Sequence, residues 1–487
     1  MNCVDYLFDN TRSLHKELVF GAQEKISYQT AYYNSQGIAK YLTKKIGQGN
    51  NILLISHNSP FFIIAYLGIL KSGNVCIPLD PAIEQNNLNF ILNKTKASIG
   101  FISSLTLKKL KIPIELFSET NINSIISNEE DGGEITKEFD GNQIAEIIFT
   151  SGSTAIPKGV MITHNNIIAN TESIIQYLEL KEHDRVLVVM PFYYCYGLSL
   201  LHTHLRVGGQ LVLNNNFIFL ASTIKNLKDY ECTGFAGVPS HFQILLRKTN
   251  LFRNSAFPSL RYVTQAGGKL HNVFIKEFTA AFPFIQFYTM YGQTEATARI
   301  SYLPPQKLND KLGSIGKGIP GVEIKVVDSK GKVVEPGKLG EIIVRGENIM
   351  AGYFDDPMES SKTIRNGWLY TGDLATIDNE GYVFIEARKK EIVKVGGKRV
   401  SLKEIEEVIN TIPGIIDCTI EYVEDSILGE AIKATIITVD HINDINEDSV
   451  RQFCGKKLSR HKIPSIIIID KKLTISSTGK KIKGKFS

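Results

Sequence analysis

The stretch Phe149-Thr-Ser-Gly-Ser-Thr-Ala-Ile-Pro-Lys-Gly-Val160 contains the most informative residues of this chain. The hydrophobic residues Ile147–Phe149 predict the end of a strand, and the residues after them are rich in hydroxyl groups and glycine. Glycine lets a backbone come close to a ligand, while N–H groups and Ser/Thr hydroxyls donate to phosphate oxygens. Lys158 adds a point charge. The stretch therefore predicts a loop that wraps a polyphosphate.

An exposed Ser/Gly linker is the alternative interpretation of this loop. A linker seldom follows a buried strand directly and seldom ends in Pro157-Lys-Gly159. The loop is also not a Walker A loop, because the pattern G-x-x-x-x-G-K-[ST] is absent.

Composition and charge restrict the class of protein. The 487 residues are 43% hydrophobic and 22% charged, which is typical of a globular protein with two or three cores. The net charge of +5 is modest and no basic block dominates, so a nucleic-acid partner is not expected. The one local bias is the range 471–487, with six lysines and no acidic residue. It is either a solvated tail or a landing surface for an anionic partner.

The cysteines and the N-terminus predict the compartment. Six scattered cysteines without a C-x-x-C pair favour neither a zinc site nor a disulfide framework. The N-terminus lacks the pattern of a signal peptide, which is a basic segment followed by an apolar segment and a cleavage site. The apolar run Phe61–Leu70 is about half the ~20 residues that a membrane span needs, which favours a buried helix. We expect a reduced, soluble, cytoplasmic protein.

Short β-branched runs alternate with helical patterns, which predicts an α/β fold with mainly parallel sheets. From Gly313 onward, Gly/Pro/Asp turns separate strand-like segments and predict a smaller β-rich subdomain. A helix at Ser401–Ile409, with Ser401 at the N-cap, begins a compact α+β C-terminal region. The predicted strand–helix pairs are Asn51–Ser56 with Pro60–Ser72, Arg185–Met190 with Gly197–Val207, and Gln210–Leu213 with Ile218–Asp229.

Five segments of the chain resemble one known superfamily. The loop at Phe149–Val160 resembles the phosphate-binding signature of acyl-CoA synthetases, peptide-synthetase adenylation domains and luciferases. Five such matches in order are not expected by chance, and they cover nearly the whole chain. The other four are Tyr291-Gly-Gln-Thr-Glu295, Trp368-Leu-Tyr-Thr-Gly-Asp373, Arg388-Lys-Lys-Glu-Ile-Val-Lys-Val-Gly-Gly-Lys-Arg399 and Ser476-Ser-Thr-Gly-Lys480.

The resemblance implies a nucleotide site for ATP and Mg²⁺. Tyr291 would lie against adenine, Thr294 would contact the α-phosphate, and Glu295 would bind the metal. Asp373 would hold the ribose hydroxyls, since one carboxylate can accept from two vicinal hydroxyls. Arg388 would assist from a hinge. The remaining expected contacts are Thr150, Ser151, Gly152, Ser153, Thr154, Lys158, Gly267 and Gly292.

The implied reaction requires charge neutralisation. A carboxylate that attacks the α-phosphate of ATP meets an anionic triphosphate, so positioning and electrostatics matter most. Lys480 would bridge the carboxylate and the α-phosphate, and with Thr294 and Glu295 it forms the expected catalytic set. Taken singly, Asp373 could be a turn acid and Glu295 a helix cap. Lys480 could be a surface charge, and the adjacent Lys481 is an alternative candidate for the catalytic role.

A second step would transfer the acyl group to a thiol. In the superfamily a domain rotation about one Lys or Asp residue presents a glycine-containing loop to a pantetheine arm. Lys390 matches that hinge, and Gly396 and Gly397 match the loop, where a narrow tunnel favours residues without side chains. We therefore expect an AMP-binding domain at 1–389, with its β-rich part at about 313–389, and a C-terminal domain at 390–487 that carries the catalytic lysine.

Pro191-Phe-Tyr-Tyr-Cys-Tyr-Gly-Leu198 resembles the segment that lines the acyl pocket. No acidic residue occurs between Met190 and Gly209, which argues against an α-amino acid as substrate. Gly237-Val-Pro239 and Thr264-Gln-Ala-Gly-Gly268 would form the other walls of the pocket and the adenine cleft. The expected pocket residues are Tyr193, Tyr194, Gly197, Val238 and Gly268.

Some residues near these motifs have other interpretations. His202 and His204 lie two apart on a predicted helix, face different sides and are interpreted as structural. Ala155 and Ala387 replace glycines that are usual in the superfamily, and an alanine would be strained there if φ were positive.

The predicted function is ATP-dependent activation of a carboxylic acid to an acyl-adenylate with release of pyrophosphate, followed by transfer to the thiol of CoA. A stand-alone enzyme that loads the phosphopantetheine of a carrier protein is the alternative. A non-catalytic nucleotide-binding protein is a third hypothesis, disfavoured by the intact set of charged residues. Neither a nucleic-acid partner nor a membrane span is expected, and the acid is not identified by the sequence.

Overall fold

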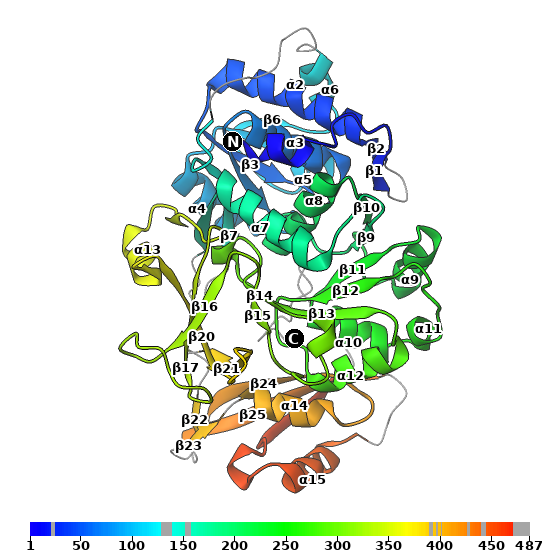
Figure 1. Ribbon diagram of the computed structural model, residues 1–487, viewed down its shortest axis with the longest axis vertical. Helices are drawn as coiled ribbons and strands as arrows, with labels where there is room; N and C mark the ends of the chain where they lie inside the picture. Colours follow the sequence, from blue (N-terminus) through cyan, green and yellow to red (C-terminus); the bar gives the residue numbers. More distant parts are fainter. Residues whose placement is uncertain are drawn as a thin grey trace.

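The computed structural model describes residues 1–20, 25–127, 139–150, 157–388, 393–395, 398–400, 402–425, 429–439 and 445–470. Figure 1 shows the N-terminal elements at one end of the long axis and the C-terminal elements at the other. No helix of the described residues is long and apolar enough to cross a lipid bilayer.

A seven-stranded sheet forms the N-terminal end, in the order β18-β8-β7-β4-β3-β5-β6. β7 pairs with β4 and β4 with β3 in parallel, whereas β8 and β18 add an antiparallel edge. The strands are β3 Asn51–Ile55, β4 Val75–Leu79, β5 Ile99–Ile102, β6 Glu115–Phe117, β7 Ile144–Thr150, β8 Lys158–Thr163 and β18 Gly352–Tyr353. The helices of this end are α1 Cys3–Phe8, α2 Tyr28–Ile46, α3 Pro60–Lys71, α4 Gln85–Thr95, α5 Ser104–Leu107 and α6 Ile122–Ser127.

A nine-stranded sheet follows, in the order β15-β14-β13-β12-β11-β9-β10-β1-β2. Its central strands are parallel, from β1 to β13 in space, and its edges are antiparallel. The strands are β1 Glu17–Phe20, β2 Ile26–Ser27, β9 Arg185–Val188, β10 Gln210–Leu213, β11 Gly234–Gly237, β12 Tyr262–Gln265, β13 Gln286–Tyr291, β14 Ser301–Leu303 and β15 Lys317–Gly318. The prediction of an α/β fold with mainly parallel sheets is confirmed.

Helices α3, α7 (His164–Leu178) and α8 (Cys195–Val207) share one buried core cluster with residues from both sheets. The interpretation of Phe61–Leu70 as a buried helix is confirmed, because every one of these residues in α3 is buried. A second cluster packs on the nine-stranded sheet with α9 Leu220–Asp229, α10 Pro239–Arg247, α11 Asn250–Arg253 and α12 Asn272–Ala281.

A third, wholly antiparallel sheet corresponds to the predicted β-rich subdomain. Its strands are β16 Glu323–Val327, β17 Gly340–Arg345, β19 Ile364–Arg365, β20 Trp368–Ile377 and β21 Val383–Arg388. The chain leaves this sheet after β17 to pair β18 with β8 of the first sheet, and then forms α13 (Pro357–Thr363). This excursion was not predicted, and it brings α13 beside the start of β8.

The C-terminal elements form their own buried cluster. They are α14 Leu402–Asn410, β24 Ile415–Asp425, β25 Gly429–Thr438, α15 Glu447–Lys457 and β26 Ile466–Asp470, close to the predicted helix and strands. β24 lies against α10, where Gln243 Nε2 donates to Asp417 Oδ1 at 2.9 Å. The predicted N-cap Ser401 lies outside the described residues, and so does the predicted domain boundary at 389–390.

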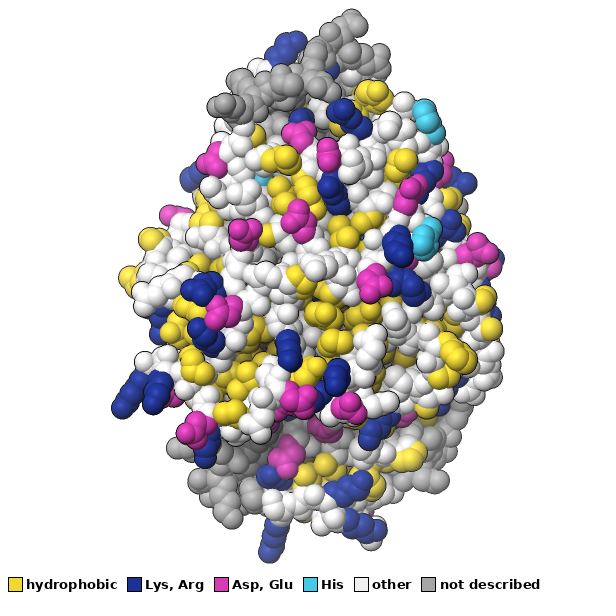
Figure 2. Space-filling model, in the orientation of Figure 1, with side chains coloured by type: hydrophobic (Ala, Val, Ile, Leu, Met, Phe, Trp, Pro, Cys, Tyr) yellow, Lys and Arg dark blue, Asp and Glu magenta, His cyan; other side chains and the backbone are white. Residues whose placement is uncertain are grey.

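Figure 2 shows basic and acidic side chains interspersed over the face in view. This distribution agrees with the modest net charge of +5.

A buried polar network joins strand β7 to helices α3 and α8. Tyr66 Oη on α3 lies 2.8 Å from Glu146 Oε2 on β7 and 2.8 Å from His202 Nε2 on α8. Burial raises the pKa of Glu146 to about 7 and lowers the pKa of His202 to about 3. His204 is also buried, with a pKa lowered to about 4, which agrees with a structural role for both histidines.

We expect Glu146→Gln to remove a pH dependence of stability. The folded state keeps the Glu146 proton up to about pH 7, whereas an unfolded chain loses it near pH 4.3. The contribution of Glu146 to the free energy of unfolding is therefore present at low pH and is lost as pH rises through 7. This contribution amounts to about 2–3 kcal/mol. Urea unfolding at several pH values would measure the free energy of unfolding of both proteins. Between pH 4.5 and 8, the stability of the variant relative to the wild type should increase by that amount. The exposed Glu335→Gln is the control, and parallel pH curves for Glu146→Gln and wild type would contradict the prediction.

Candidate active site

The predicted phosphate loop joins two paired strands. β7 and β8 are antiparallel neighbours, with Thr150 opposite Lys158. Lys158 was predicted to lie in the loop, but its pairing with Thr150 makes it the first residue of β8. Ser151, Gly152, Ser153 and Thr154 lie outside the described residues, as does Ala155.

Lys158 is held by the helix that follows β18. Its Nζ lies 2.5 Å from Glu359 Oε1 on α13 and 5.2 Å from the centre of the Tyr353 ring. Asp356 caps α13 by accepting from the Glu359 backbone N–H at 3.0 Å, with Pro357 at the first helical position. The sequence Asp356-Pro357 is a local signal for this helix start, but it gives no sign of the contact with Lys158.

Tyr353 connects Lys158 with Glu295. The Tyr353 hydroxyl donates to Glu295 Oε1 at 2.8 Å, and burial together with Glu295 raises the pKa of Tyr353. Glu295 lies in a 3-10 turn, Thr294–Ala296, and its backbone carbonyl accepts from Met350 N at 3.0 Å. The carboxylate thus points to a side chain from another segment, rather than capping a helix. Sequence reasoning missed Tyr353.

Asp373 contacts two other residues that were predicted for the site. Tyr291 Oη donates to Asp373 Oδ2 at 2.6 Å, and Arg388 Nε lies 3.2 Å from Asp373 Oδ1. Asp373 is opposite Arg388 in the β20–β21 ladder, which explains the ion pair. Burial, followed by the Asp373 charge, raises the pKa of Tyr291. The alternative of a turn acid is wrong for Asp373, because it lies inside β20 and is 4% exposed.

Ala387 lies in strand β21, which determines its backbone conformation. Ala387 is opposite Leu374 in the same ladder and is not among the described residues with positive φ. An alanine there is unstrained.

The segment after β13 folds back sharply on itself. A Cβ on Gly292 would lie 1.9 Å from the carbonyl oxygen of Ala298, so the close approach requires glycine. Thr294 is buried, and its Oγ1 lies 3.6 Å from Cys195 Sγ at the start of α8. The predicted α-phosphate contact therefore adjoins the predicted acyl-pocket segment. Gly267 has φ +83°, a value that favours glycine.

The predicted acyl-pocket residues belong to the start of α8 and the ends of two strands. Tyr193 and Tyr194 are half-buried, and Val238 is fully buried after β11. A Cβ on Gly197 would lie 2.0 Å from the Pro191 carbonyl oxygen, so this glycine allows α8 to begin. A Cβ on Gly268 would meet only the Pro239 ring, at 3.3 Å.

Residues 9–354 match the family of AMP-binding enzymes. The chain belongs to this family. It is 28% identical to the oxalate–CoA ligase of Arabidopsis thaliana over 457 residues, covering 89% of this chain and 87% of the relative. It is 29% identical to the medium-chain fatty-acid–CoA ligase of Escherichia coli over 467 residues, covering 90% and 81%.

Solved structures share the fold of this AMP-binding enzyme. An anthranilate CoA ligase in complex with anthranoyl-AMP superposes with a TM-score of 0.90 at 22% identity, covering 99% of this chain and 95% of that one. The o-succinylbenzoate CoA synthetase of Bacillus subtilis, in complex with ATP and magnesium, has a TM-score of 0.83 at 24% identity, with 99% and 98% covered.

Glu295 fits the resemblance to a magnesium site. No cluster of three or more His, Cys, Asp or Glu residues that could hold a metal occurs in the part of the chain that the structure describes. Mg²⁺ is commonly bound through one or two carboxylates, with phosphate oxygens and waters as the other ligands. Tyr353 occupies Glu295 Oε1, and no described residue donates to Oε2. The single carboxylate suits a metal that arrives with a nucleotide.

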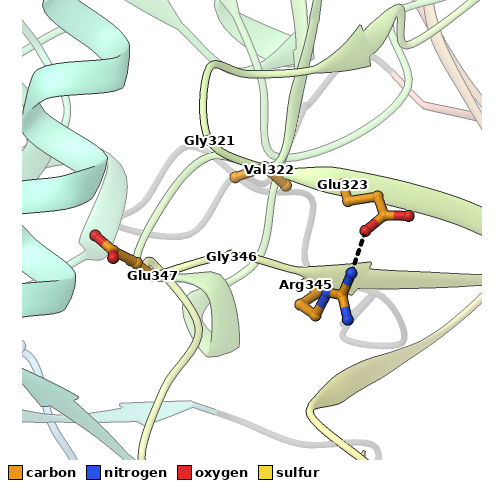
Figure 3. Close-up of a pocket in the computed structure, with 6 residues that line it drawn as sticks. All are labelled: Gly321, Val322, Glu323, Arg345, Gly346 and Glu347. Carbon is orange, nitrogen blue, oxygen red and sulfur yellow. Dashed lines mark hydrogen bonds and ion pairs between the residues drawn. The ribbon is translucent and has the colours of Figure 1, made fainter.

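A surface hollow of about 610 Å³ lies elsewhere in this AMP-binding enzyme. Its six lining residues come from the start of β16 and the end of β17: Gly321, Val322, Glu323, Arg345, Gly346 and Glu347. Figure 3 shows Glu323 and Arg345 pointing toward each other, as an ion pair of 2.7 Å. None of these residues was predicted for the site.

Four further predicted residues of the AMP-binding enzyme, Lys390, Gly396, Gly397 and Lys480, lie outside the described residues. Their roles stay predictions.

We expect Glu359→Gln to lower the KM for ATP about two- to fivefold, because Glu359 competes with phosphate oxygens for a partly exposed lysine. Initial rates of pyrophosphate release at varied ATP would measure this. Glu380→Gln, which removes an exposed acid paired with Lys311, is the matched control. A higher KM for ATP would contradict the prediction and would mean that Glu359 positions Lys158 for the phosphates.

Proposed function

We propose that this protein is an AMP-forming acyl-CoA ligase. It activates a carboxylic acid with MgATP, releases pyrophosphate, and transfers the acyl group from the adenylate to the thiol of CoA. One observation carries the proposal: the short segment Tyr291–Glu295 contacts the Asp373–Arg388 ion pair at one end and Tyr353 at the other. Tyr291 donates to Asp373, which pairs with Arg388, whereas Glu295 accepts from Tyr353, whose ring lies beside Lys158.

The nucleotide would lie along this segment. Asp373 accepts from the ribose hydroxyls, and Arg388 orients its carboxylate. Lys158 moves from Glu359 to the β- and γ-phosphates, together with the hydroxyls of the loop. Glu295 holds the magnesium of the substrate, which supplies charge neutralisation to the phosphates. Thr294 donates to the α-phosphate.

The chemistry then needs little covalent help from the protein. A carboxylate oxygen attacks the α-phosphorus, the bond to the β-phosphate oxygen breaks, and pyrophosphate leaves. Lys480 lowers the repulsion between the two anions as the new bond forms. In the second step the CoA thiolate attacks the acyl carbonyl and AMP leaves. Lys390 is the proposed hinge between the two steps, and Gly396 and Gly397 line the approach of the pantetheine arm.

The relatives do not agree on the acid. Their names specify oxalate, medium-chain fatty acids and long-chain fatty acids. All three are named CoA ligases, which favours CoA over a carrier protein as acceptor. The lysine-rich range 471–487 supports the carrier protein as the second candidate, since an acidic carrier would suit it as well as the phosphates of CoA.

ATP–pyrophosphate exchange with a panel of aliphatic, aromatic and hydroxy acids tests the first step. Exchange that depends on one class of acid is the expected result, and ATP binding without exchange for any acid would overturn the proposal. CoA and a phosphopantetheinylated carrier protein are then compared as acceptors. Faster thioester formation with CoA is expected, whereas transfer to the carrier alone would favour the second candidate.

A further inference from the structure

Tyr353 is held in place beside the nucleotide segment by three neighbouring elements. It is 8% exposed and pairs with Val160 in the β18–β8 ladder. Its backbone N–H donates to Ser360 Oγ on α13 at 2.8 Å. Just before β18, Met350 N donates to the Glu295 carbonyl at 3.0 Å. The position of the Tyr353 side chain is therefore set by β8, by α13 and by the turn that carries Glu295.

The Tyr353 hydroxyl is bound to the carboxylate of Glu295. It donates to Glu295 Oε1 at 2.8 Å, and Thr363 on α13 is a second hydrogen-bond partner of this hydroxyl. A hydroxyl has one proton to donate, and an ionised carboxylate can only accept. The proton of Tyr353 is therefore committed to Glu295, and the oxygen remains available as an acceptor for Thr363.

The ring of Tyr353 also adjoins the lysine expected to bind phosphate. Lys158 Nζ lies 5.2 Å from the centre of the ring, and Glu359 is its ion-pair partner. One side chain thus contacts both the carboxylate that would bind the metal and the lysine that would bind the phosphates. A change confined to the hydroxyl, which leaves the ring in place, separates these two contacts.

The hydrogen bond from Tyr353 makes the two oxygens of Glu295 unequal. Glu295 is half-buried, and its Oε2 receives no hydrogen bond or ion pair from the residues that the structure describes. A carboxylate held through Oε1 favours binding a metal through the other oxygen alone. Mg²⁺ demands near-octahedral geometry at short distances, whereas Ca²⁺ has a larger, flexible shell and accepts both oxygens of one carboxylate. A carboxylate that offers one oxygen therefore suits Mg²⁺ better than Ca²⁺.

We propose that Tyr353 is a positioning residue that makes Glu295 a one-oxygen metal ligand, and that it thereby selects Mg²⁺ over Ca²⁺ in the nucleotide complex. The hydroxyl occupies Oε1 and leaves Oε2 for the metal. Loss of a partner that orients a metal ligand typically lowers metal affinity about 10- to 100-fold. The proposal rests on the ligase function, because the metal is the one that arrives with ATP.

Calorimetric titration with α,β-methylene-ATP tests this inference, because the enzyme cannot release pyrophosphate from that analogue. The Kd is measured with excess Mg²⁺, with excess Ca²⁺ and with EDTA, and we expect the wild type to bind most tightly with Mg²⁺. Tyr353→Phe keeps the ring beside Lys158 and should weaken binding of the Mg²⁺ complex about tenfold or more. The Ca²⁺ complex should weaken less, because Ca²⁺ accepts a carboxylate that is free to turn. Binding with EDTA should stay near the wild-type value, since the hydroxyl is not a proposed phosphate contact.

A double-mutant cycle shows whether the hydroxyl acts through Glu295. Glu295→Gln should itself remove most of the tightening by Mg²⁺, and adding Tyr353→Phe should then cause no further loss. Tyr66→Phe is the matched control, because the Tyr66 hydroxyl lies 2.8 Å from the carboxylate of Glu146, away from the nucleotide segment. It should leave the Kd of the Mg²⁺ complex at the wild-type value.

Equal weakening of the Mg²⁺, Ca²⁺ and metal-free complexes in Tyr353→Phe would overturn the inference, because a general disturbance of the site acts on all three alike. An unchanged Kd for the Mg²⁺ complex would also overturn it, and so would a further loss when Tyr353→Phe is added to Glu295→Gln. If the wild type binds the analogue under none of the three conditions, the proposed ligase function itself is contradicted.

Discussion

Replacing Lys480 with alanine is expected to lower acyl-adenylate formation about 10²- to 10³-fold, the usual effect of removing a group that stabilises transition-state charge. Transfer of the acyl group from a supplied acyl-adenylate to CoA should stay within about threefold of wild type. The reason is that the lysine neutralises two anions only while the carboxylate attacks the α-phosphate. The second step has no such encounter, because the adenylate is already formed.

Two measurements separate these steps for Lys480→Ala. ATP–pyrophosphate exchange reports the first step, and single-turnover thioester formation from a synthetic acyl-adenylate reports the second. Lys481→Ala is the matched control, because it removes the adjacent charge and should leave both rates near wild type. Equal loss of both steps, or a larger loss in Lys481→Ala, would contradict the assignment of Lys480.

Replacing Asp373 with alanine is expected to lower kcat/KM for ATP about 10²-fold or more, since two hydrogen bonds to a charged acceptor are lost. The change also unpairs Arg388 and the Tyr291 hydroxyl, both of which Asp373 binds in the ligand-free site. Wild type should use 2′-deoxy-ATP less well than ATP. Asp373→Ala should use the two nucleotides about equally, because the ribose acceptor is gone.

The control for Asp373 is Asp378→Ala, which removes a carboxylate paired with Lys311 just beyond the end of β20. It should leave the nucleotide preference unchanged. Continued discrimination between ATP and 2′-deoxy-ATP by Asp373→Ala would refute the ribose role, whatever the loss in rate. Thermal unfolding of both variants would show whether the site change also weakens the β20–β21 sheet.

Contiguous residues were enough to predict the α/β class and the family. The alternation of short strands and helices predicted the mainly parallel sheets, and the strand predicted to end near Phe149 is β7, which ends at Thr150. The assignment of Lys158 to the loop was wrong, because pairing with Thr150 is decided by the register between strands rather than by local composition.

The partners of the predicted residues could not be predicted in the same way. Glu359 reaches Lys158 across 201 residues of sequence, and Tyr353 reaches Glu295 across 58. Both contacts depend on β18 crossing from the third sheet to the first, and no local pattern in the sequence signals that crossing.

The sequence by itself determined the type of nucleotide chemistry, because each motif is a run of neighbouring residues whose spacing is set by covalent geometry. Only the tertiary structure decided which charges meet: Lys158 with Glu359, and Asp373 with Arg388. The physical reason is that the strength of a charge interaction depends on distance and burial, and both arise when distant segments pack together.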